Sequence, residues 1–171
     1  MNRRPITLAA VAGGLVLGLS PALFRPSTMV IWNATASAPE GLYRLRPSNP
    51  LHVGQWVAVA PPPALSDWLA RRDAAPKGVL LIKRVAALSP SLICWSGGVV
   101  SLDGQLVAIA QTRDRNGRPL PILIGCRRVA ADQVFLLNAA PGSLDGRYFG
   151  PLPRSAVIGQ VTPIWVADHE G

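Results

Sequence analysis

The stretch "GVLLIKRVAAL", residues 78–88, is a short apolar run that lies between Pro76 and Pro90. Runs of this length and composition, bounded by Pro and Gly, are typical of strands that are buried on both faces or nearly so. Short runs rich in β-branched and aromatic residues recur at residues 29–32, 41–45, 54–60, 134–140 and 156–166. So many short strands at this spacing predict an all-β sandwich or barrel rather than a sheet of alternating strands and helices.

Three further stretches complete the predicted organisation. The runs at residues 91–102 and 105–110 flank Asp103-Gly104, a dipeptide that favours a two-residue hairpin turn. One helix is predicted, at residues 64–72 ("ALSDWLARR"), because apolar residues recur there at helical spacing after three prolines. The segment 113–121 is polar, contains Gly and Pro, and is predicted to be a loop.

The N-terminal segment predicts the compartment. Residues 6–24 carry no charge and follow Arg3 and Arg4, and a run of this length spans a bilayer as a helix. We expect a retained anchor with its short tail in the cytoplasm, since positive residues stay on that side. The alternative is a signal peptide cut after the small-residue triplet at 34–36, just before Ser37. That triplet lies well beyond the apolar run, whereas a signal peptide is cut close to its core, so the spacing favours the anchor.

The chain length leaves room for one domain after the N-terminal segment, and we expect that domain to be exported. With the tail and anchor at residues 1–25, we expect residues 26–171 to form a single β-rich domain without repeats. The formal net charge of +8 is carried by 15 arginines and only two lysines. Basic balance suits nucleic acid, anionic lipid or a solvated surface. Because no aromatic residues are interleaved with the arginine clusters for base stacking, we do not expect nucleic-acid binding.

The cysteines and histidines limit the possible chemistry. Cys94 and Cys126 are expected to form a disulfide in an exported domain, closing a loop of about 30 residues. Two thiols without a histidine close by do not make a closed zinc site. His52, beside a turn, and His169, at the C-terminus, are not placed for a Ser-His-Asp triad. Since phosphate-binding and dinucleotide-binding motifs are also missing from the sequence, we expect no metal and no cofactor.

Lys83 is the candidate general base. It lies inside the apolar run 78–88, and its neighbour Arg84 must point to the opposite face of that strand. Burial disfavours the ammonium form, so the pKa of Lys83 is expected to fall toward a range where the amine accepts a proton. Arginine cannot take this role because its guanidinium stays charged. The alternative is a lysine whose amine reaches solvent from the end of the strand.

A neutral lysine amine needs a hydroxyl to activate, and Ser37 is the candidate nucleophile. Pairing of Ser with Lys is an established variant of the nucleophile and base arrangement. The Thr35 hydroxyl, two residues earlier, is a candidate to join the Ser37 backbone N–H in stabilising an oxyanion. The triplet before Ser37 is then part of an active-site strand rather than a cleavage site.

A third segment, "PGSLDGRYFG" at residues 141–150, is predicted to complete the site. Ser143 is a candidate to hold the lysine amine in place. Asp145 and Arg147, two residues apart on one side of an extended segment, are expected to form an ion pair that braces the loop. The alternative is that this segment is only a glycine-rich structural turn.

These motifs together resemble a known family. In chain order they are Ser-x-Pro-x-Gly-x-Tyr, Lys-Arg-Val-x-Ala and Ser-x-Asp-x-Arg-x-x-Gly, at residues 37–43, 83–87 and 143–150. With an apolar segment before the first, this order resembles the type I signal peptidases (S26), and more closely their conjugative-transfer branch, the TraF-type maturation peptidases. Ala38 and Gly146 depart from general leader peptidases, which usually have Met and often have Ser at these places.

The resemblance implies a membrane-anchored serine endopeptidase with Ser37 as nucleophile, Lys83 as base and the partly open β-barrel of that family. It implies an inner-membrane location with the catalytic domain on the periplasmic side. The implied partners are the bilayer, a pilin-like precursor as substrate, and components of a conjugative pilus or type IV secretion system. Cleavage by hydrolysis and cleavage with cyclisation both stay open. The alternatives are a general type I leader peptidase and a non-catalytic anchored scaffold of a secretion or pilus complex.

Overall fold

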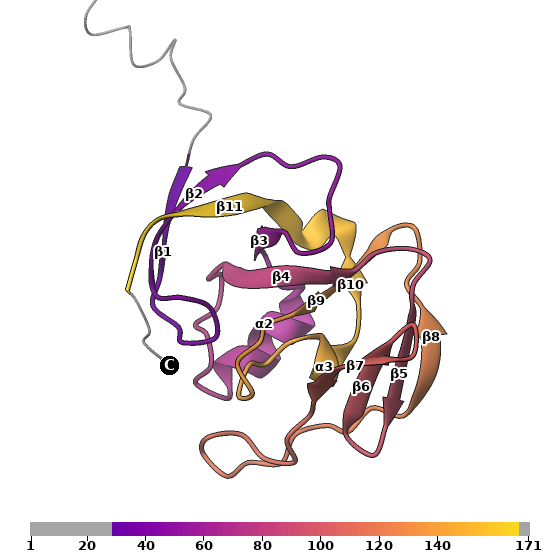
Figure 1. The fold of residues 1–171 in the computed structure, drawn as a ribbon. Helices are drawn as coiled ribbons and strands as arrows, with labels where there is room; N and C mark the ends of the chain where they lie inside the picture. The colour runs from indigo at the N-terminus through magenta and orange to yellow at the C-terminus, as the bar shows by residue number, and fades with distance from the viewer. Residues whose placement is uncertain (1–28, 168–171) are drawn as a thin grey trace, which may run out of the picture.

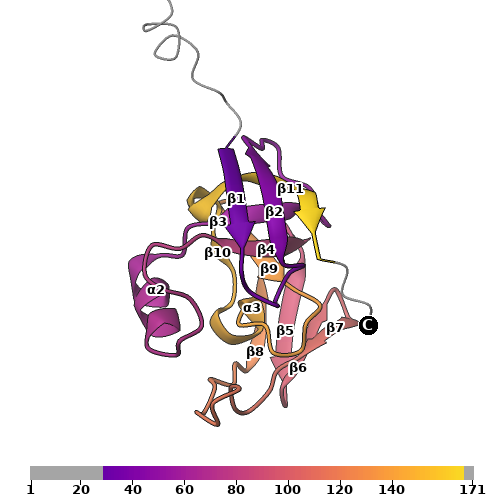
Figure 2. The ribbon, with the colours of Figure 1, turned by 90° about the vertical axis from the view of Figure 1, so that its left-hand side faces the viewer.

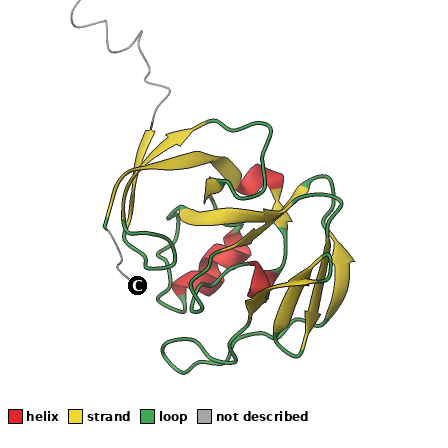
Figure 3. Ribbon diagram, in the orientation of Figure 1, coloured by secondary structure: helices red, strands yellow, loops and turns green. Residues whose placement is uncertain are grey.

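The computed structural model describes residues 29–167, which form eleven strands, two short α-helices and one 3-10 turn (Figure 3). The strands belong to two sheets, one of seven strands and one of four. Within each sheet, neighbouring strands pair antiparallel. The prediction of a mainly β domain is therefore confirmed.

The larger sheet has the strand order β1-β2-β11-β3-β4-β9-β10 (Figure 1). Its strands are β1 (Met29–Asn33), β2 (Gly41–Arg46), β3 (Trp56–Val59), β4 (Leu81–Ala87), β9 (Gln133–Leu137), β10 (Leu152–Pro153) and β11 (Val157–Val166). The long strand β11 pairs with β3 through its first residues and with β2 through the rest. The strand predicted at 78–88 is β4, and it lies inside the sheet between β3 and β9.

The smaller sheet has the order β7-β6-β5-β8. Its strands are β5 (Leu92–Ser96), β6 (Val99–Leu102), β7 (Gln105–Ile109) and β8 (Gly125–Arg128). The stretch 91–102 thus holds two strands, which are joined by a turn at Gly97 and Gly98. Both glycines have positive φ, 57° and 86°, a backbone region that other residues rarely adopt.

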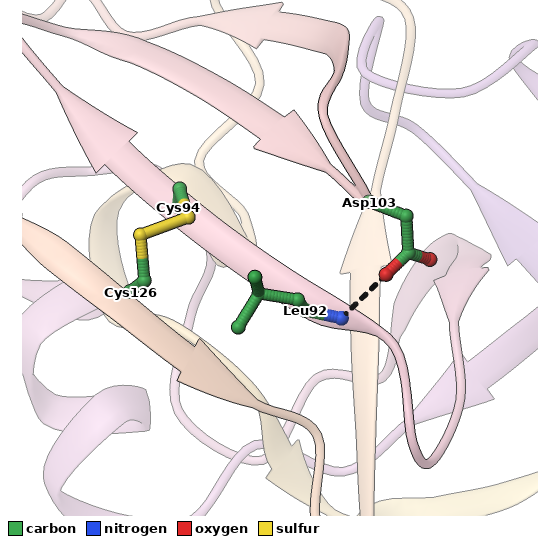
Figure 4. The surroundings of a disulfide bond; sticks show 4 residues. All are labelled: Leu92, Cys94, Asp103 and Cys126. Atoms are coloured by element: carbon green, nitrogen blue, oxygen red, sulfur yellow. Dashed lines mark hydrogen bonds between the residues drawn. A yellow bond between two sulfur atoms is a disulfide. The ribbon is translucent and has the colours of Figure 1, made fainter.

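Cys94 and Cys126 face each other across β5 and β8 and are joined by a disulfide bond (Figure 4). At the other edge of β5, the Leu92 backbone N–H donates a hydrogen bond of 2.8 Å to Asp103, the first residue of the predicted hairpin turn. The smaller sheet is therefore fixed covalently on one side of β5 and by a turn residue on the other.

The helices lie outside the sheets. α2 (Pro63–Ala70), which lies to one side of the larger sheet in Figure 2, begins one residue before the helix predicted at 64–72 and ends two residues before it. The helix buries Leu69. The others are short: α3 (Gly146–Phe149) and the 3-10 turn Arg154–Ala156.

The core connects the two sheets. One cluster lies in the larger sheet around Val57, Val59 and Val85. A second contains Trp95 of the smaller sheet and Phe135 of β9, whose rings pack edge to face with centroids 6.0 Å apart. This aromatic contact, a favourable geometry for ring pairs, holds the smaller sheet against β9.

The anchor predicted at residues 6–24 lies outside the described residues. So do the predicted domain boundary at residue 26 and His169. Among residues 29–167, no helix has the length and apolar character needed to cross a membrane.

Candidate active site

The loop that carries Ser37 is held by one buried side chain, Asn33 at the end of β1. Its amide nitrogen lies 3.0, 3.1 and 2.9 Å from the carbonyl oxygens of Thr35, Ala38 and Pro39. The Tyr43 hydroxyl from β2 donates to the Pro39 carbonyl as well, at 2.7 Å. The loop carbonyls are therefore paired with side chains, which fixes the backbone on both sides of Ser37.

Gly41 explains the glycine of the first motif. It has φ +145°, and a Cβ built there would overlap the backbone carbonyl of Trp165 on β11. Any other residue would push the end of β2 away from β11, so the glycine allows the close pairing that follows the Ser37 loop.

The Ser37 and Thr35 hydroxyls are neighbours, with their oxygens 3.4 Å apart. Thr35 donates its own hydroxyl proton to the Asn33 side-chain oxygen at 2.8 Å, so toward Ser37 it acts as acceptor. Service as an oxyanion donor would require the Thr35 hydroxyl to turn away from Asn33. Thr35 thus lies beside Ser37, and Asn33, which holds it, was not among the predicted site residues.

Lys83 is buried in β4, with 4% of its surface exposed, whereas Arg84 is exposed on the other face. Its amine donates a hydrogen bond of 2.9 Å to the Ser143 hydroxyl. Burial lowers the pKa of Lys83 from 10.5 to about 8, against the opposing effect of Asp145 and with a smaller lowering by Arg147. The alternative of an amine that reaches solvent is therefore wrong.

Asp145 and Arg147 form a fully buried ion pair of 2.8 Å. The ion pair was predicted, but the extended backbone predicted for it is wrong. Asp145 is the N-cap of the one-turn helix α3, and its carboxylate also accepts the Arg147 backbone N–H. The residues meet because a capping carboxylate turns back over the first helical turn. The guanidinium also donates to the Asn138 and Pro141 carbonyls, at 2.7 and 3.2 Å, and so ties down the loop before α3.

Asn138 joins this loop to the Lys83 strand. Its side chain accepts a hydrogen bond from the Arg84 backbone N–H and donates one to the Ile82 carbonyl, both at 3.1 Å. Its own backbone N–H donates to Asp145 at 3.0 Å. The residues on either side of Lys83 are thus fixed relative to the carboxylate.

Gly146 accounts for the departure from the serine that leader peptidases often have there. A Cβ at this position would lie 2.5 Å from the Phe135 ring and 2.8 Å from the Leu136 carbonyl. The first turn of α3 packs directly on β9, which leaves no space for a side chain.

Ser37, Lys83 and Ser143 line one cleft of about 740 Å³, together with Thr35. The other residues that line the cleft come from the Ser37 loop, the segment that follows α2, strand β4 and the loops at 111–120 and 140–144. They are Ala34, Ala36, Glu40, Arg72, Asp73, Ala74, Pro76, Leu81, Gln111, Asp114, Arg115, Leu120, Ala140, Gly142 and Leu144. Asp145 and Arg147 lie behind this lining, buried under the loop. Cys94 and Cys126 are on the smaller sheet and take no part in the cleft.

Neither a histidine base nor a metal site is found beside this cleft among residues 29–167. His52 is exposed, and its backbone N–H bonds to Gln55. Within residues 29–167, no group of three or more His, Cys, Asp or Glu side chains is arranged to hold a metal ion.

Asn33 and Asn138 are the site residues that the sequence prediction missed. Each follows a short apolar strand, "MVIW" in one case and "VFLL" in the other. A single Asn directly after a short apolar strand can therefore indicate a residue that organises a site, because a buried amide must find hydrogen-bond partners.

Comparison with known proteins identifies the class. The family model "Signal peptidase, peptidase S26" matches residues 3–166, and the chain belongs to this family. The match includes the Ser37 loop, β4 and the 141–150 loop, so it covers the whole site described above.

The similar proteins place the chain in the TraF-type branch, as predicted. "Probable conjugal transfer protein TraF" of Sinorhizobium fredii is 35% identical, over 74% of this chain and 72% of that protein. "Conjugal transfer protein TraF" of Agrobacterium tumefaciens is 30% identical, over 94% and 87%. "Plasmid transfer protein TraF" of Escherichia coli is 28% identical, over 91% and 92%.

Proposed function

We propose that this chain is a serine endopeptidase with Ser37 as nucleophile and Lys83 as general base. The observation that carries the proposal is the buried Lys83 amine, with its pKa lowered to about 8, in the wall of the cleft that Ser37 also lines. A base with a pKa near neutral is present in its free form often enough to act, and still binds the proton once it has taken it.

In the proposed reaction, neutral Lys83 takes the Ser37 hydroxyl proton while Oγ attacks the carbonyl carbon of the scissile peptide bond. The oxyanion that forms would be met by the Ser37 backbone N–H and, after it turns, the Thr35 hydroxyl. Protonated Lys83 then gives its proton to the leaving amine, and the acyl group stays on Ser37 as an ester. Water hydrolyses this ester, or the amino terminus of the substrate attacks it and closes a ring.

Ser143, Asp145 and Arg147 are proposed to support the base. The Ser143 oxygen accepts one amine hydrogen at 2.9 Å, so the lone pair of the neutral amine is directed elsewhere. Burial has the largest effect on the pKa of Lys83. Asp145 raises this pKa and Arg147 lowers it, so the two members of the ion pair oppose each other. The pair therefore braces the loop without restoring the pKa of an exposed lysine.

The substrate is proposed to be an exported precursor, pilin-like, that is cut after a small residue. The cleft lining includes Ala34, Ala36, Ala140 and Gly142, which together with Ser37 present short side chains to an extended peptide. The conjugal and plasmid transfer functions named for the relatives favour a precursor used in conjugation, with the pilus or secretion machinery as partner.

The domain is proposed to sit at the outer face of the inner membrane, on the periplasmic side, behind the predicted anchor. Trp32 of β1 and Trp165 of β11 stack with ring centroids 6.0 Å apart, and both are more than half exposed. Met29 and Val30, at the start of β1, are exposed too. Exposed tryptophans are enriched where a protein meets the membrane interface, which supports attachment through this edge of the sheet.

A non-catalytic scaffold is the second candidate, and one observation favours it. The Lys83 amine is hydrogen-bonded to Ser143 and the Ser37 hydroxyl to Thr35, so nucleophile and base are not bonded to each other in this structure. A general leader peptidase, the other alternative, would show the same chemistry on a wider range of precursors.

The deciding experiment compares processing of a precursor encoded beside this chain when both are co-expressed, measured by intact-mass spectrometry. Ser37→Ala and Lys83→Arg are both expected to abolish processing, since one removes the nucleophile and the other keeps the charge but removes the base. The matched controls are Ser155→Ala, at an exposed serine, and Lys77→Arg, at an exposed lysine paired with Asp67. Both controls should process normally.

The product mass separates the two outcomes of the ester, because a ring is lighter than the cut linear chain by one water. Normal processing by folded Ser37→Ala or Lys83→Arg protein would exclude the peptidase and leave the scaffold.

A further inference from the structure

A clasp of hydrogen bonds joins the turn that follows α2, residues 71–73, to the loop 112–120. The loop lies at the lower end of the molecule in Figures 1 and 2. The centre of the clasp is Arg118, which donates to Asp114 at 2.8 Å, to Asp73 at 3.2 Å and to the carbonyls of Arg71 and Arg72. One side chain thus bonds to both segments. The loop was expected to be a polar turn only, and the proposed function gives it no role.

Arg72 strengthens the clasp from the helix side. Its guanidinium bonds to Asp114 at 3.1 Å and to the Pro119 carbonyl at 2.8 Å, and it lies 4.4 Å from the centre of the Trp68 ring. Burial opposes the charge on Asp114, but hydrogen bonds from Arg118, Asn116 and Arg72 prevail and lower its pKa to about 2. The Asp114 carboxylate is therefore ionised throughout the neutral range.

Both segments line the cleft that holds Ser37 and Lys83. The lining groups are Arg72, Asp73 and Ala74 from the turn that follows α2 and Asp114, Arg115 and Leu120 from the loop. We call residues 71–73 and 113–118 the arginine wall. They contain five arginines and two aspartates, an excess of three positive charges. Two of these arginines, Arg72 and Arg115, line the cleft together with both aspartates, and the other three are not part of the lining.

Arg115 is the group of this wall that is available to a ligand. It is exposed, and among the described residues its guanidinium makes one hydrogen bond, to the Asp73 carbonyl at 2.8 Å. Five N–H donors in a planar fork leave most of the guanidinium uncommitted. Arg72 and Arg118, by contrast, are already paired with carboxylates.

The Ser37 side of the cleft has the opposite charge. Glu40 lines it three residues after the nucleophile, and no ion pair to it is found among the described residues. A peptide carboxylate in the cleft would be repelled by Glu40 and attracted to the arginines on the opposite side.

We propose that the arginine wall binds an acidic side chain of the substrate close to the cleaved bond, with Arg115 as the residue that meets the carboxylate. This inference rests on the proposed function, because it takes the cleft to be the peptide-binding site. It narrows the substrate class to precursors with a small residue at the cut and Glu or Asp nearby. A guanidinium fork and a carboxylate form paired, charge-assisted hydrogen bonds, a geometry that lysine at the same place would not reproduce.

The test measures binding of fluorescent peptides to the full-length Ser37→Ala protein in mild detergent, so that no peptide is consumed. The probes are 16-residue alanine- and serine-rich peptides with one Glu, Gln or Lys placed in turn at each position on either side of a central Ala-Ala bond. At one or two neighbouring positions, Glu is expected to bind about five- to tenfold more tightly than Gln, with Lys weakest, as hydrogen bonds to charged groups suggest. The preference should weaken as salt is raised.

The variants assign the preference to its residue. Arg115→Ala, added to Ser37→Ala, is expected to remove the Glu preference, and Arg115→Glu to reverse it in favour of Lys. Arg154→Glu makes the same charge change on the exposed 3-10 turn, outside the cleft lining, and should leave the preference intact. Equal binding of Glu and Gln peptides at every position, absence of any binding, or a Glu preference that survives in Arg115→Glu would overturn the inference.

Cleavage by the protein with Ser37 intact separates the two proposals. Peptides bound with a Glu preference but never cut would refute the peptidase and keep the acidic-ligand site. Peptides cut at equal rates whatever their charge would keep the peptidase and refute the arginine wall as a selector.

Discussion

Replacing Lys83 with Met tests whether burial of the charged amine costs the folded protein stability. Burial lowers the pKa of Lys83 from 10.5 to about 8, which at 1.36 kcal/mol per pKa unit disfavours the charged form by about 3 kcal/mol in the folded state. Below pH 8 the lysine is charged in both states and the full cost is present. Between pH 8 and 10.5 the unfolded chain binds more protons than the folded one, so the stability of the protein rises with pH in that window.

Met is close to Lys in size and carries no charge, so Lys83→Met removes the cost at every pH. Its gain at pH 7 is reduced by the lost hydrogen bond to Ser143, about 1 kcal/mol, and this loss varies little with pH. The advantage of the variant over the wild type should therefore shrink by about 2.5 kcal/mol between pH 7 and pH 10.

Urea unfolding of both full-length proteins in mild detergent at pH 7, 8, 9 and 10 measures this advantage. Lys77→Met, at the exposed lysine, is the control and should show no such trend. An advantage for Lys83→Met that stays constant from pH 7 to pH 10 would show that the lysine pKa is not lowered in the folded protein, and the argument for a neutral base would fail.

Three further results are expected. The rate of precursor processing should rise with pH and level off above about 8, because the base acts only when Lys83 is neutral; a rate that is flat from pH 6 to 9 would contradict this. Gly146→Ser should lower the free energy of unfolding by about 1 to 3 kcal/mol through overlap with Phe135, while Gly142→Ser, where nothing lies within 4 Å, should not; urea titration compares them. Replacing Cys94 and Cys126 together by Ser should cost about 3 to 4 kcal/mol of stability, and an unchanged unfolding midpoint with and without reductant would argue against the bond.

The strands and the buried lysine could be predicted because their signals are local. The run around Lys83 is apolar enough to require burial wherever it lies in the fold, and alternation places Arg84 on the other face. Neither inference needs the partners of β4. The arrangement of the strands was not predictable in this way: β4 pairs with β3, its predecessor in sequence, but also with β9, some 50 residues later.

The hydrogen-bond partners could not be predicted because they depend on tertiary contacts. The 141–150 motif indicated an ion pair, but the turn that makes it possible is a helix cap packed on Phe135, a contact set by the fold. The same holds for Thr35, whose hydroxyl proton is bonded to Asn33 in this structure and must turn before it can meet an oxyanion. Short spacing in sequence therefore brought these residues together but did not predict the helical turn between Asp145 and Arg147 or the partner of Thr35.

Asn138 explains how the base keeps its position while its charge changes. Its amide bonds to the backbone on both sides of Lys83, and its backbone N–H bonds to Asp145. An amide does not titrate, so the hydrogen bonds of Asn138 to the backbone on both sides of Lys83 stay in place whether the amine is charged or neutral. We therefore expect the processing rate to follow the ionisation of Lys83 alone, near pH 8. A second ionisation in the rate would mean that another group takes part in the reaction.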